Sequence, residues 1–424
     1  MAHLRVIVVL ALRNLRRQLR RTLLTCLAMI IGGALLMFSL TLGDGTHEEW
    51  IESGVRMGSG HVTIESPEFR SSRRIEDRLS ETARQATERV LASAGIAEQV
   101  QTVSPKLVIT GLASSAAGAR PVQVMGVEPR AESSFSTLDD QLVEGRYLES
   151  DDRLAAYVGI GLVESLSLRL GSRLVVTAQD ADKEIAGQLL RVVGIFRTGV
   201  SAIDQTLIHI PLETAGEWLG SGGDVTNLGI IVEDSSAVSG LVVRLKHALA
   251  EPIGDGTTIV MDWREAMPQL SAAFAIDDFG NYLVYGILFI IIGFGIVNTV
   301  LMSVMHRYRE FGVLQALGLT PGQTGGLVLV EGLVLTAVSA VIGIGLGIFV
   351  TWYFFGDGLD FSALMDEEMT FAGVVIDPVI IPLFRTTRII QALAFILSIG
   401  VLASVYPAIL AAKIDVTEAM KFDR

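Results

Sequence analysis

Four long apolar stretches stand out from the rest of the chain, at 23–42, 282–305, 327–355 and 389–412. A helix needs about 20 apolar residues to cross the hydrocarbon core of a bilayer. None of the stretches contains an arginine, a lysine or an aspartate, and Glu331 is the one charged residue within them. It lies near the start of the third stretch, where a long side chain can reach the membrane interface. The pattern therefore predicts four transmembrane helices.

A different pattern fills the 236 residues between the first and second stretches, 44–279. Polar helical patterns are clearest at 68–91 and 235–250, and a glycine with an acidic pair near 140–152 marks a candidate domain boundary. Short runs rich in β-branched residues predict seven strands, at 61–65, 106–110, 122–127, 173–177, 190–196, 207–210 and 230–232. The predicted fold class is a membrane protein with four transmembrane α-helices and a large mixed α+β extracytoplasmic domain between the first and second.

The end of this domain has the pattern of a helix that leads into the second apolar stretch. Asp262 can accept hydrogen bonds from free backbone N–H groups at a helix start, and Glu265 follows three positions later. Only one proline and one glycine interrupt residues 267–282 as helix breakers. We therefore predict a stalk helix that includes Trp263, Glu265 and Phe279 and carries the domain on the second span. The alternative is a simple linker of similar length.

The polar loop between the second and third stretches predicts a short amphipathic helix. Phe311, Leu314 and Leu317 recur at helical spacing, and Gly318 can end the helix. The run 320–323, Thr-Pro-Gly-Gln, then has the pattern of a new helix start, with a cap, a proline at the first position and a reciprocal cap. A rigid helix between two spans suits docking to a partner that pushes. On pattern alone, an ordinary helical hairpin is the alternative.

Composition narrows the class of protein. Hydrophobic residues make up 50% of the 424 residues and charged residues 19%, and the mean hydropathy is +0.51. These values exclude a disordered chain, a collagen-like repeat and an ordinary cytosolic enzyme. The net charge of −13 argues against nucleic acid as a partner, because phosphate binding favours a basic surface. The one cysteine, Cys26, excludes an internal disulfide or a zinc cluster built on thiolates.

The distribution of charge predicts the orientation. Six arginines and no acidic residue occur among the first 21 residues, so the positive-inside rule places the N-terminus, and after four spans the C-terminus, in the cytoplasm. Under that topology the cytoplasmic segments hold 11 basic and 4 acidic residues, whereas 44–279 holds 20 basic and 35 acidic residues. The first apolar stretch is longer than the core of a signal peptide, and no A-x-A-like site follows it, so we expect a retained anchor.

These expectations divide the chain into nine segments. They are a cytoplasmic amphipathic segment (1–21), the first transmembrane helix (22–43), the α+β domain with its stalk (44–279), the second transmembrane helix (280–305), a cytoplasmic loop (306–326), the third transmembrane helix (327–355), a short outer loop (356–388), the fourth transmembrane helix (389–412) and a cytoplasmic tail (413–424).

The sequence offers no recognisable catalytic or metal site. It contains neither G-x-x-x-x-G-K-[ST] nor H-E-x-x-H, and its six histidines lack ligand-like spacing. The glycine-containing runs 159–161 and 343–347 do not match a phosphate loop. Gly343 and Gly347 are better suited to let another transmembrane helix approach closely. We therefore expect no catalytic residue, no bound metal and no cofactor on this chain, and an enzyme is not expected.

The loop resembles a known motif. Residues 309–318, Arg-Glu-Phe-Gly-Val-Leu-Gln-Ala-Leu-Gly, are similar to the coupling helix of FtsX-like, MacB-type permeases of ABC transporters, commonly written R-x-E-[IF]-G-x-L-R-A-L-G. Here Arg309 adjoins Glu310 directly, and Gln315 stands where an arginine or lysine is frequent. The resemblance implies that the residues coupling the chain to an ATPase are Arg309, Glu310, Phe311, Gly312, Leu314, Gln315, Ala316, Leu317 and Gly318.

Two further segments agree with this family. Residues 11–17, with 21–24 entering the first span, resemble its N-terminal amphipathic segment. Residues 406–412 with 417–420 resemble its C-terminal ending, with Val416 in place of the usual proline. The order of one span, a large domain and three spans also matches over the entire chain. The segments 60–65 and 298–302 look most like the lipoprotein-releasing, LolC/LolE-like branch.

This resemblance implies a permease that works by mechanotransmission in the bacterial inner membrane, with lipoprotein release as the expected task. Its expected partners are an ABC ATPase dimer that uses ATP and Mg²⁺ on a separate subunit, a second permease copy or paralogue, a lipoprotein or other amphiphilic cargo, a periplasmic carrier and membrane lipid. The alternatives are a MacB-like exporter of small molecules, peptides or lipids, a non-transporting FtsX-like regulator of cell-wall hydrolases and, more remotely, a membrane-anchored enzyme.

Overall fold

The computed structural model describes residues 19–253, 257–360, 370–371, 374–375 and 379–416. These residues fall into two compact units. The helical unit contains residues up to 48, the segment 276–362 and the segment from 378 onward, and the α/β domain contains 49–275 with part of the later loop. The predicted N-terminal amphipathic segment and the end of the C-terminal tail lie largely outside the described residues.

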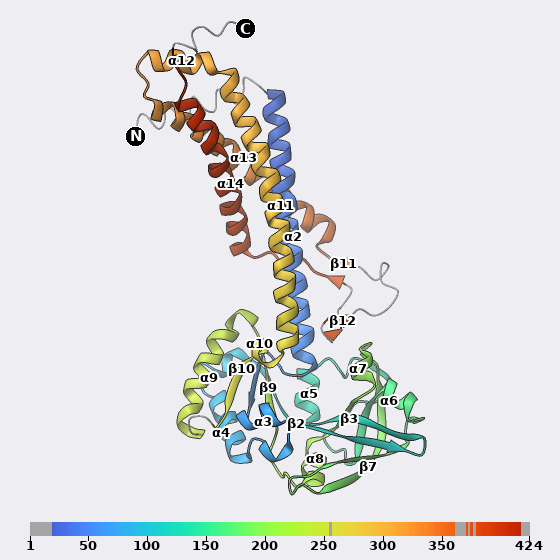
Figure 1. Cartoon of the computed structure of the whole chain (residues 1–424). Coiled ribbons are helices and arrows are strands. Elements are labelled where there is room, and N and C mark those ends of the chain that lie inside the picture. The colour runs from blue at the N-terminus through green and yellow to red at the C-terminus, as the bar shows by residue number, and fades with distance from the viewer. Residues whose placement is uncertain (1–18, 254–256, 361–369, 372–373, 376–378, 417–424) are drawn as a thin grey trace. The chain divides into compact units, whose positions relative to one another are not determined.

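Four helices of the described chain are long and apolar enough to cross a membrane, as predicted (Figure 1). They are α2 (Leu19–Met57), α11 (Pro268–His306), α13 (Pro321–Phe355) and α14 (Thr386–Ala412). Both α2 and α11 extend well beyond the apolar stretches that identify them. As a result, each runs without a break from the helical unit into residues that belong to the α/β domain.

Small residues let the helices of the bundle pack closely. A Cβ atom added to Gly343 of α13 would lie 2.7 Å from the carbonyl oxygen of Ile30 on α2, and one added to Gly347 would lie 2.8 Å from that of Ala34. This confirms that the two glycines serve close helix approach. Gly325 of α13 meets α14 in the same way, because its added Cβ would lie 3.0 Å from the Ala408 oxygen.

The α/β domain is built on one mixed sheet with the strand order β10-β1-β9-β2-β3-β8-β5-β7-β4, and β6 pairs with both β2 and β7. Its strands are β1 (Val62–Glu65), β2 (Val100–Ser115), β3 (Gly118–Val127), β4 (Leu142–Gly145), β5 (Ala155–Gly159), β6 (Arg173–Gln179), β7 (Ile185–Phe196), β8 (Leu207–Pro211), β9 (Asn227–Val232) and β10 (Ile259–Asp262).

Most of the predicted elements of this domain are present. All seven predicted strands are confirmed, as β1, β2, β3, β6, β7, β8 and β9, whereas β4, β5 and β10 were not predicted. The stretch 140–152 is not a boundary, because β4 lies within it and pairs with β7 in the same sheet. The predicted helix at 68–91 is broken into α3 (Pro67–Ser72), a short 3-10 turn and α4 (Glu81–Leu91), since Arg73 adopts a left-handed conformation with φ 55°.

The two largest apolar clusters of this domain lie on the sheet. One joins β1, β9 and β10 to α4 and to α9 (Val238–Ile253), with Ile64, Leu228 and Leu241 fully buried. The other joins β2, β3 and β5–β8 to α6 (Ile160–Ser165) and α8 (Leu212–Leu219). Two further short helices belong to this domain: α5 (Pro129–Phe135) follows β3 in the sequence, and α7 (Ser201–Asp204) precedes β8. The predicted outer loop contains two short antiparallel strand pairs, β11 (Leu359–Asp360) with β14 (Val379–Ile380) and β12 (Thr370–Phe371) with β13 (Val374–Val375).

Candidate functional site: the α12 loop and the stalk

The loop between α11 and α13 contains the predicted short helix, α12 (Tyr308–Ala316). Gly318 follows it with φ +106°, a conformation that favours glycine, so the predicted end is confirmed. Thr320 then caps α13: its hydroxyl accepts from the Gln323 N–H, and the Gln323 side chain accepts from the Thr320 N–H. Proline occupies the first turn, as the sequence predicts. Local sequence therefore determines how this loop begins and ends.

The nine residues assigned to coupling, which lie in α12 and at the two positions after it, divide between a buried and an exposed side. Phe311 and Gly312 are buried, and Leu314 and Gln315 are partly buried. Arg309, Glu310, Ala316, Leu317 and Gly318 are exposed. With Val313, three of these form the surface that we call the docking face: Arg309, Val313, Ala316 and Leu317, at helical spacing, with 78% of Leu317 exposed. This face is available to another protein.

The opposite side of α12 is held by polar contacts with α13 and α14. The Gln315 amide donates to the Ala411 carbonyl oxygen (3.3 Å) and to the Thr324 hydroxyl (3.4 Å). Gln315 therefore points toward the bundle and not toward the docking face. On the same side of the loop, Glu331 accepts from Arg307 at 2.8 Å, and the Glu331 side chain is 12% exposed. The sequence motif included neither Arg307 nor this ion pair.

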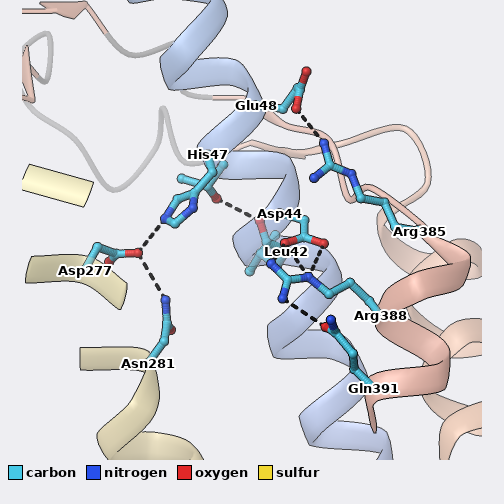
Figure 2. A network of polar contacts seen from close by, with 10 residues as sticks. Leu42, Asp44, His47, Glu48, Asp277, Asn281, Arg385, Arg388 and Gln391 are labelled. Carbon is cyan, nitrogen blue, oxygen red and sulfur yellow. Dashed lines mark hydrogen bonds and ion pairs between the residues drawn. The ribbon is translucent and has the colours of Figure 1, made fainter. Parts of the chain in front are cut away.

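At the end of the bundle opposite α12, arginines of α14 and its N-terminal cap hold α2 (Figure 2). Arg388 donates to both carboxylate oxygens of Asp44, at 2.6 Å from Nη2 to Oδ1 and 2.9 Å from Nε to Oδ2. Arg385 donates to Glu48 at 2.6 Å. Forked arginine–carboxylate contacts are geometrically specific, and Asp44 is only 5% exposed. These contacts fix α14 against α2 on one side.

On its other side α2 contacts α11 through a histidine (Figure 2). The Nε2 atom of His47 lies 2.8 Å from an Asp277 carboxylate oxygen, which also accepts from the Asn281 amide at 3.1 Å. The two sides of α2 therefore differ in chemistry, with arginine contacts to α14 and an imidazole contact to α11. Among the described residues, no group of three or more His, Cys, Asp or Glu side chains is arranged to hold a metal ion.

The predicted stalk residues lie in two different environments. Asp262 accepts from the Glu265 N–H and starts the short helix α10 (Trp263–Ala266), which confirms the predicted cap. Trp263 is 5% exposed and its ring centroid lies 5.6 Å from that of Phe274, both within the α/β domain. Phe279 belongs to the helical unit and is 65% exposed. The stalk is not one helix from Asp262 onward, because Met267 (ψ 72°) separates α10 from α11.

Within the α/β domain, the end of α2 and the start of α11 share an apolar cluster. Val55 of α2 and Leu270 of α11 pack with the rings of Trp263, Phe274 and Phe135. The cluster therefore anchors one end of α2 and one end of α11 in the α/β domain. One sequence offers no direct signal for it, because its members come from five elements that extend from α2 to α11 along the chain.

A buried ion pair next to this cluster was also not predicted. Lys106 donates to Glu132 at 3.0 Å, and the two side chains are 0% and 1% exposed. Lys106 also donates to the carbonyl oxygen of Gly58, just beyond α2, at 3.3 Å, and Ser104 donates to Glu132 at 2.6 Å. Burial lowers the pKa of Lys106, and Glu132 opposes that change. A lone lysine in a strand pattern reads as a solvent-facing residue, which is why sequence reasoning missed it.

Two family models match this chain. The model of the FtsX-like permease C-terminal domain matches residues 282–416, and the model of the MacB-like periplasmic core domain matches residues 22–248. The first covers α12 with the helices on either side of it, and the second covers most of α2 and of the α/β domain. The two matches therefore account for both the bundle and the domain between its first two helices.

Curated relatives come from several branches. The chain is 22% identical to an uncharacterized ABC transporter permease of Methanocaldococcus jannaschii, over 81% of this chain and 82% of that one. It is 22% identical to the lipoprotein-releasing system transmembrane protein LolC of Neisseria meningitidis, over 57% and 59% of the two chains. It is 24% identical to the macrolide export ATP-binding/permease protein MacB of Shewanella oneidensis, over 94% of this chain and 58% of MacB.

Two solved structures are similar to part of this chain. The extracellular domain of the transporter YknZ aligns with a TM-score of 0.35 and 16% identity, covering 47% of this chain and 98% of that domain. The periplasmic region of MacB from Actinobacillus actinomycetemcomitans aligns with a TM-score of 0.34 and 16% identity, covering 47% and 87%.

Proposed function

Because the chain belongs to the family of FtsX-like permeases with a MacB-like periplasmic core domain, and is an ABC transporter permease of the MacB/LolC type, we propose that it works by mechanotransmission. An ATPase dimer moves α12, the helices of the bundle shift, and α2 and α11 carry the movement to the α/β domain. The observation that carries this proposal is the continuity of α11, one helix from Pro268 to His306.

The ATPase acts at the docking face of α12. Arg309 is exposed, and no ion-pair partner for it is found in the described part of the chain, so it can pair with a carboxylate of another subunit. Val313, Ala316 and Leu317 supply apolar contact area beside it. ATP and Mg²⁺ belong to the separate ATPase subunit, since this sequence has no G-x-x-x-x-G-K-[ST] motif. The MacB relative is named as both ATP-binding and permease, and this chain spans 58% of its length.

The cargo is a lipoprotein or another amphiphilic molecule of the inner membrane. The relatives named LolC support this choice, and so does the apolar character of the spans, which offer no charged path for a hydrophilic solute. Both termini lie in the cytoplasm and the α/β domain faces the periplasm, following the charge distribution of the sequence. A second permease copy or paralogue completes the transporter, and a periplasmic carrier receives the cargo.

A MacB-like exporter of small molecules, peptides or lipids is the second candidate. One observation favours it: the match to MacB extends over 94% of this chain, whereas the match to the Neisseria LolC extends over 57%. Sequence identity is similarly low in both cases, 24% and 22%. The two functions share the ATPase and the movement, and they differ in cargo and in the outer partner.

The test is affinity purification of the tagged full-length chain in mild detergent, followed by mass spectrometry of the proteins that accompany it. Recovery of an ABC ATPase with lipid-modified proteins supports lipoprotein release. An ATPase with a periplasmic adaptor or an outer-membrane channel favours the exporter, and an ATPase with a cell-wall hydrolase favours an FtsX-like regulator. Repeated absence of any ATPase contradicts the proposed function.

A further inference from the structure

The junction between α11 and α12 consists of one residue, Arg307. Helix α11 ends at His306 and α12 begins at Tyr308, with Arg307 between them at φ −106° and ψ 16°. Its N–H donates to the Ser303 and Val304 oxygens at the end of α11, and its carbonyl oxygen accepts from the Phe311 N–H of α12. The backbone of Arg307 therefore takes part in the hydrogen bonding of both helices.

The other end of α12 is connected more loosely. Four residues, 317–320, separate α12 from α13, and Gly318 among them adopts φ +106°. Glycine has more backbone freedom than any other residue, and so this connection yields more easily than the junction at Arg307. A force applied to α12 is therefore transmitted more directly to α11 than through the backbone to α13.

The side chain of Arg307 adds the missing connection to α13. Its Nη1 atom donates to the Glu331 carboxylate of α13 at 2.8 Å, and its Nε atom donates to Glu310 of α12 at 3.0 Å. The guanidinium also lies over the ring of Phe311, 4.7 Å from its centroid. Ser303 of α11 donates to the second oxygen of Glu331 at 3.3 Å. One planar group thus joins α11, α12 and α13.

This environment is unlike that of the neighbouring arginine. The side chain of Arg307 is 14% exposed and faces the bundle, whereas Arg309 is exposed on the docking face. A forked guanidinium can hold two carboxylates at fixed angles, which the single ammonium of a lysine cannot do. A buried charge pair also resists separation, because each partner would be left without compensation.

We infer that Arg307 is a positioning residue that converts a displacement of α12 into a joint displacement of α11 and α13, and that it does not itself dock the ATPase. This inference rests on the proposed function. Arg309 docks and Arg307 transmits, although the two arginines are only two residues apart. Loss of Arg307 should therefore leave the ATPase bound, but movement of α12 should no longer displace the opposite end of the bundle.

The experiment compares four full-length proteins reconstituted in lipid nanodiscs with the ATPase that co-purifies with the wild type. They are the wild type, the double variant Arg307→Met/Glu331→Met, the variant Arg307→Lys and the variant Arg309→Gln. The double variant removes both buried charges together, so that neither is left unpaired. Each carries Cys26→Ala and spin labels on cysteines at Tyr282 of α11 and Ile390 of α14, which are 71% and 61% exposed. The measurements are the bound ATPase per permease and the change in label distance on trapping with ADP and vanadate.

In the wild type we expect the ATPase to bind and the label distance to change on trapping. The double variant should bind the ATPase as the wild type does, with KM for ATP unchanged, but lose the distance change. Arg307→Lys should keep part of that change. Arg309→Gln should lower ATPase binding by roughly 5-fold or more, the scale of losing one contributing side chain at an interface.

Three outcomes overturn the inference. The first is a wild-type distance change in the double variant, which would mean that the pair is only structural. The second is a loss of ATPase binding in the double variant like that of Arg309→Gln, which would make Arg307 part of the docking surface. The third is a wild type that binds the ATPase without any distance change, because then no movement passes through this junction. Failure of the wild type to bind any ATPase is different, because it contradicts the proposed function itself.

Discussion

His209 illustrates how burial determines the charge of a single side chain. It is 2% exposed on β8, and its Nδ1 atom lies 3.3 Å from the Tyr147 hydroxyl. Burial lowers the pKa of His209 from 6.5 to about 4; nearby Glu132 raises it and Lys106 lowers it. The folded protein therefore keeps this imidazole neutral at pH values where the unfolded chain protonates it.

The sign of the pH effect follows directly. Between pH 6.5 and 4 the unfolded state binds more protons, so the stability that neutral His209 contributes is present above pH 6.5 and is lost as the pH falls toward 4. From pH 7 to pH 5 the loss in free energy of unfolding should be about 2 kcal/mol. Denaturant unfolding of the wild type and of His209→Gln, followed by tryptophan fluorescence, measures this. Equal pH dependence of the two proteins would contradict the prediction.

Gly347 carries a second prediction at the residue scale. A Cβ atom there would lie 2.8 Å from the Ala34 oxygen and 3.0 Å from the Met37 Cβ, so Gly347→Ala forces α2 and α13 apart. We expect a loss of about 1–3 kcal/mol, as for other overpacked sites. Gly345→Ala is the matched control, because nothing lies within 4 Å of its added Cβ. The midpoint of detergent-induced unfolding compares the two variants, and similar midpoints would exclude a close-approach role.

Single residues also show where sequence reasoning succeeds and where it stops. The caps at Asp262 and Thr320 are predictable, because each acts on an N–H group only three residues away. The Arg307–Glu331 pair joins residues 24 positions apart, and Lys106–Glu132 joins residues 26 positions apart. Such pairs depend on how elements pack, and one sequence does not show that packing. Glu331 was correctly noticed as the one charge in the spans, but its partner was not.

Among the elements, α12 makes the sharpest prediction under the proposed function. Leu317 is 78% exposed on its docking face, so Leu317→Glu should not disturb the core, but it places a charge in an apolar contact with the ATPase. We expect at least about 2 kcal/mol of lost binding, or roughly a 30-fold weaker affinity. Retention of the ATPase by the tagged permease in detergent, titrated with added ATPase subunit, provides the measurement.

The matched control for this element is Ile185→Glu, at the start of β7. Ile185 is 84% exposed in the α/β domain, so the two substitutions make the same chemical change at equally exposed sites in different units. Ile185→Glu should retain the ATPase as the wild type does. Equal retention by Leu317→Glu would show that the docking face is not the contact.

Elements were predicted well where one kind of residue forms a continuous run. The four apolar helices follow from the length of their apolar stretches, and seven strands follow from runs rich in β-branched residues. In contrast, β5 has the sequence Ala-Ala-Tyr-Val-Gly, which contains one β-branched residue and is buried along its whole length. The polar stretch at 68–91 has helical composition throughout, yet Arg73 turns the chain and Ser80 starts a new helix with its side chain. Composition thus predicted that the stretch is helical, but the conformation of Arg73 and the cap at Ser80 determine where its helices end and begin.

At the scale of the whole molecule, the order of elements explains the mechanism that we propose. One apolar helix precedes the α/β domain and three follow it, so that the domain is joined to the bundle through the long helices α2 and α11. The docking face lies in the loop after α11. A load on α12 therefore acts on the end of a helix whose other end lies in the domain, and the stiffness of α11 becomes the quantity to test.

Gly280 allows that test without disturbing any side-chain contact. It lies within α11, and nothing lies within 4 Å of a Cβ added there. Gly280→Pro removes a backbone hydrogen bond and clashes with the preceding turn, at a cost of about 3 kcal/mol to the helix, whereas Gly280→Ala should stabilise the helix by up to about 1 kcal/mol.

Under mechanotransmission the proline variant should bind the ATPase and hydrolyse ATP at the basal rate, but lose stimulation of ATP turnover by the co-purifying cargo. The alanine variant should keep or increase this stimulation. The measurement is the ratio of stimulated to basal ATP turnover for both variants in nanodiscs. Equal ratios would mean that α11 does not transmit the movement of α12. The α/β domain would then be moved through α2 or not at all.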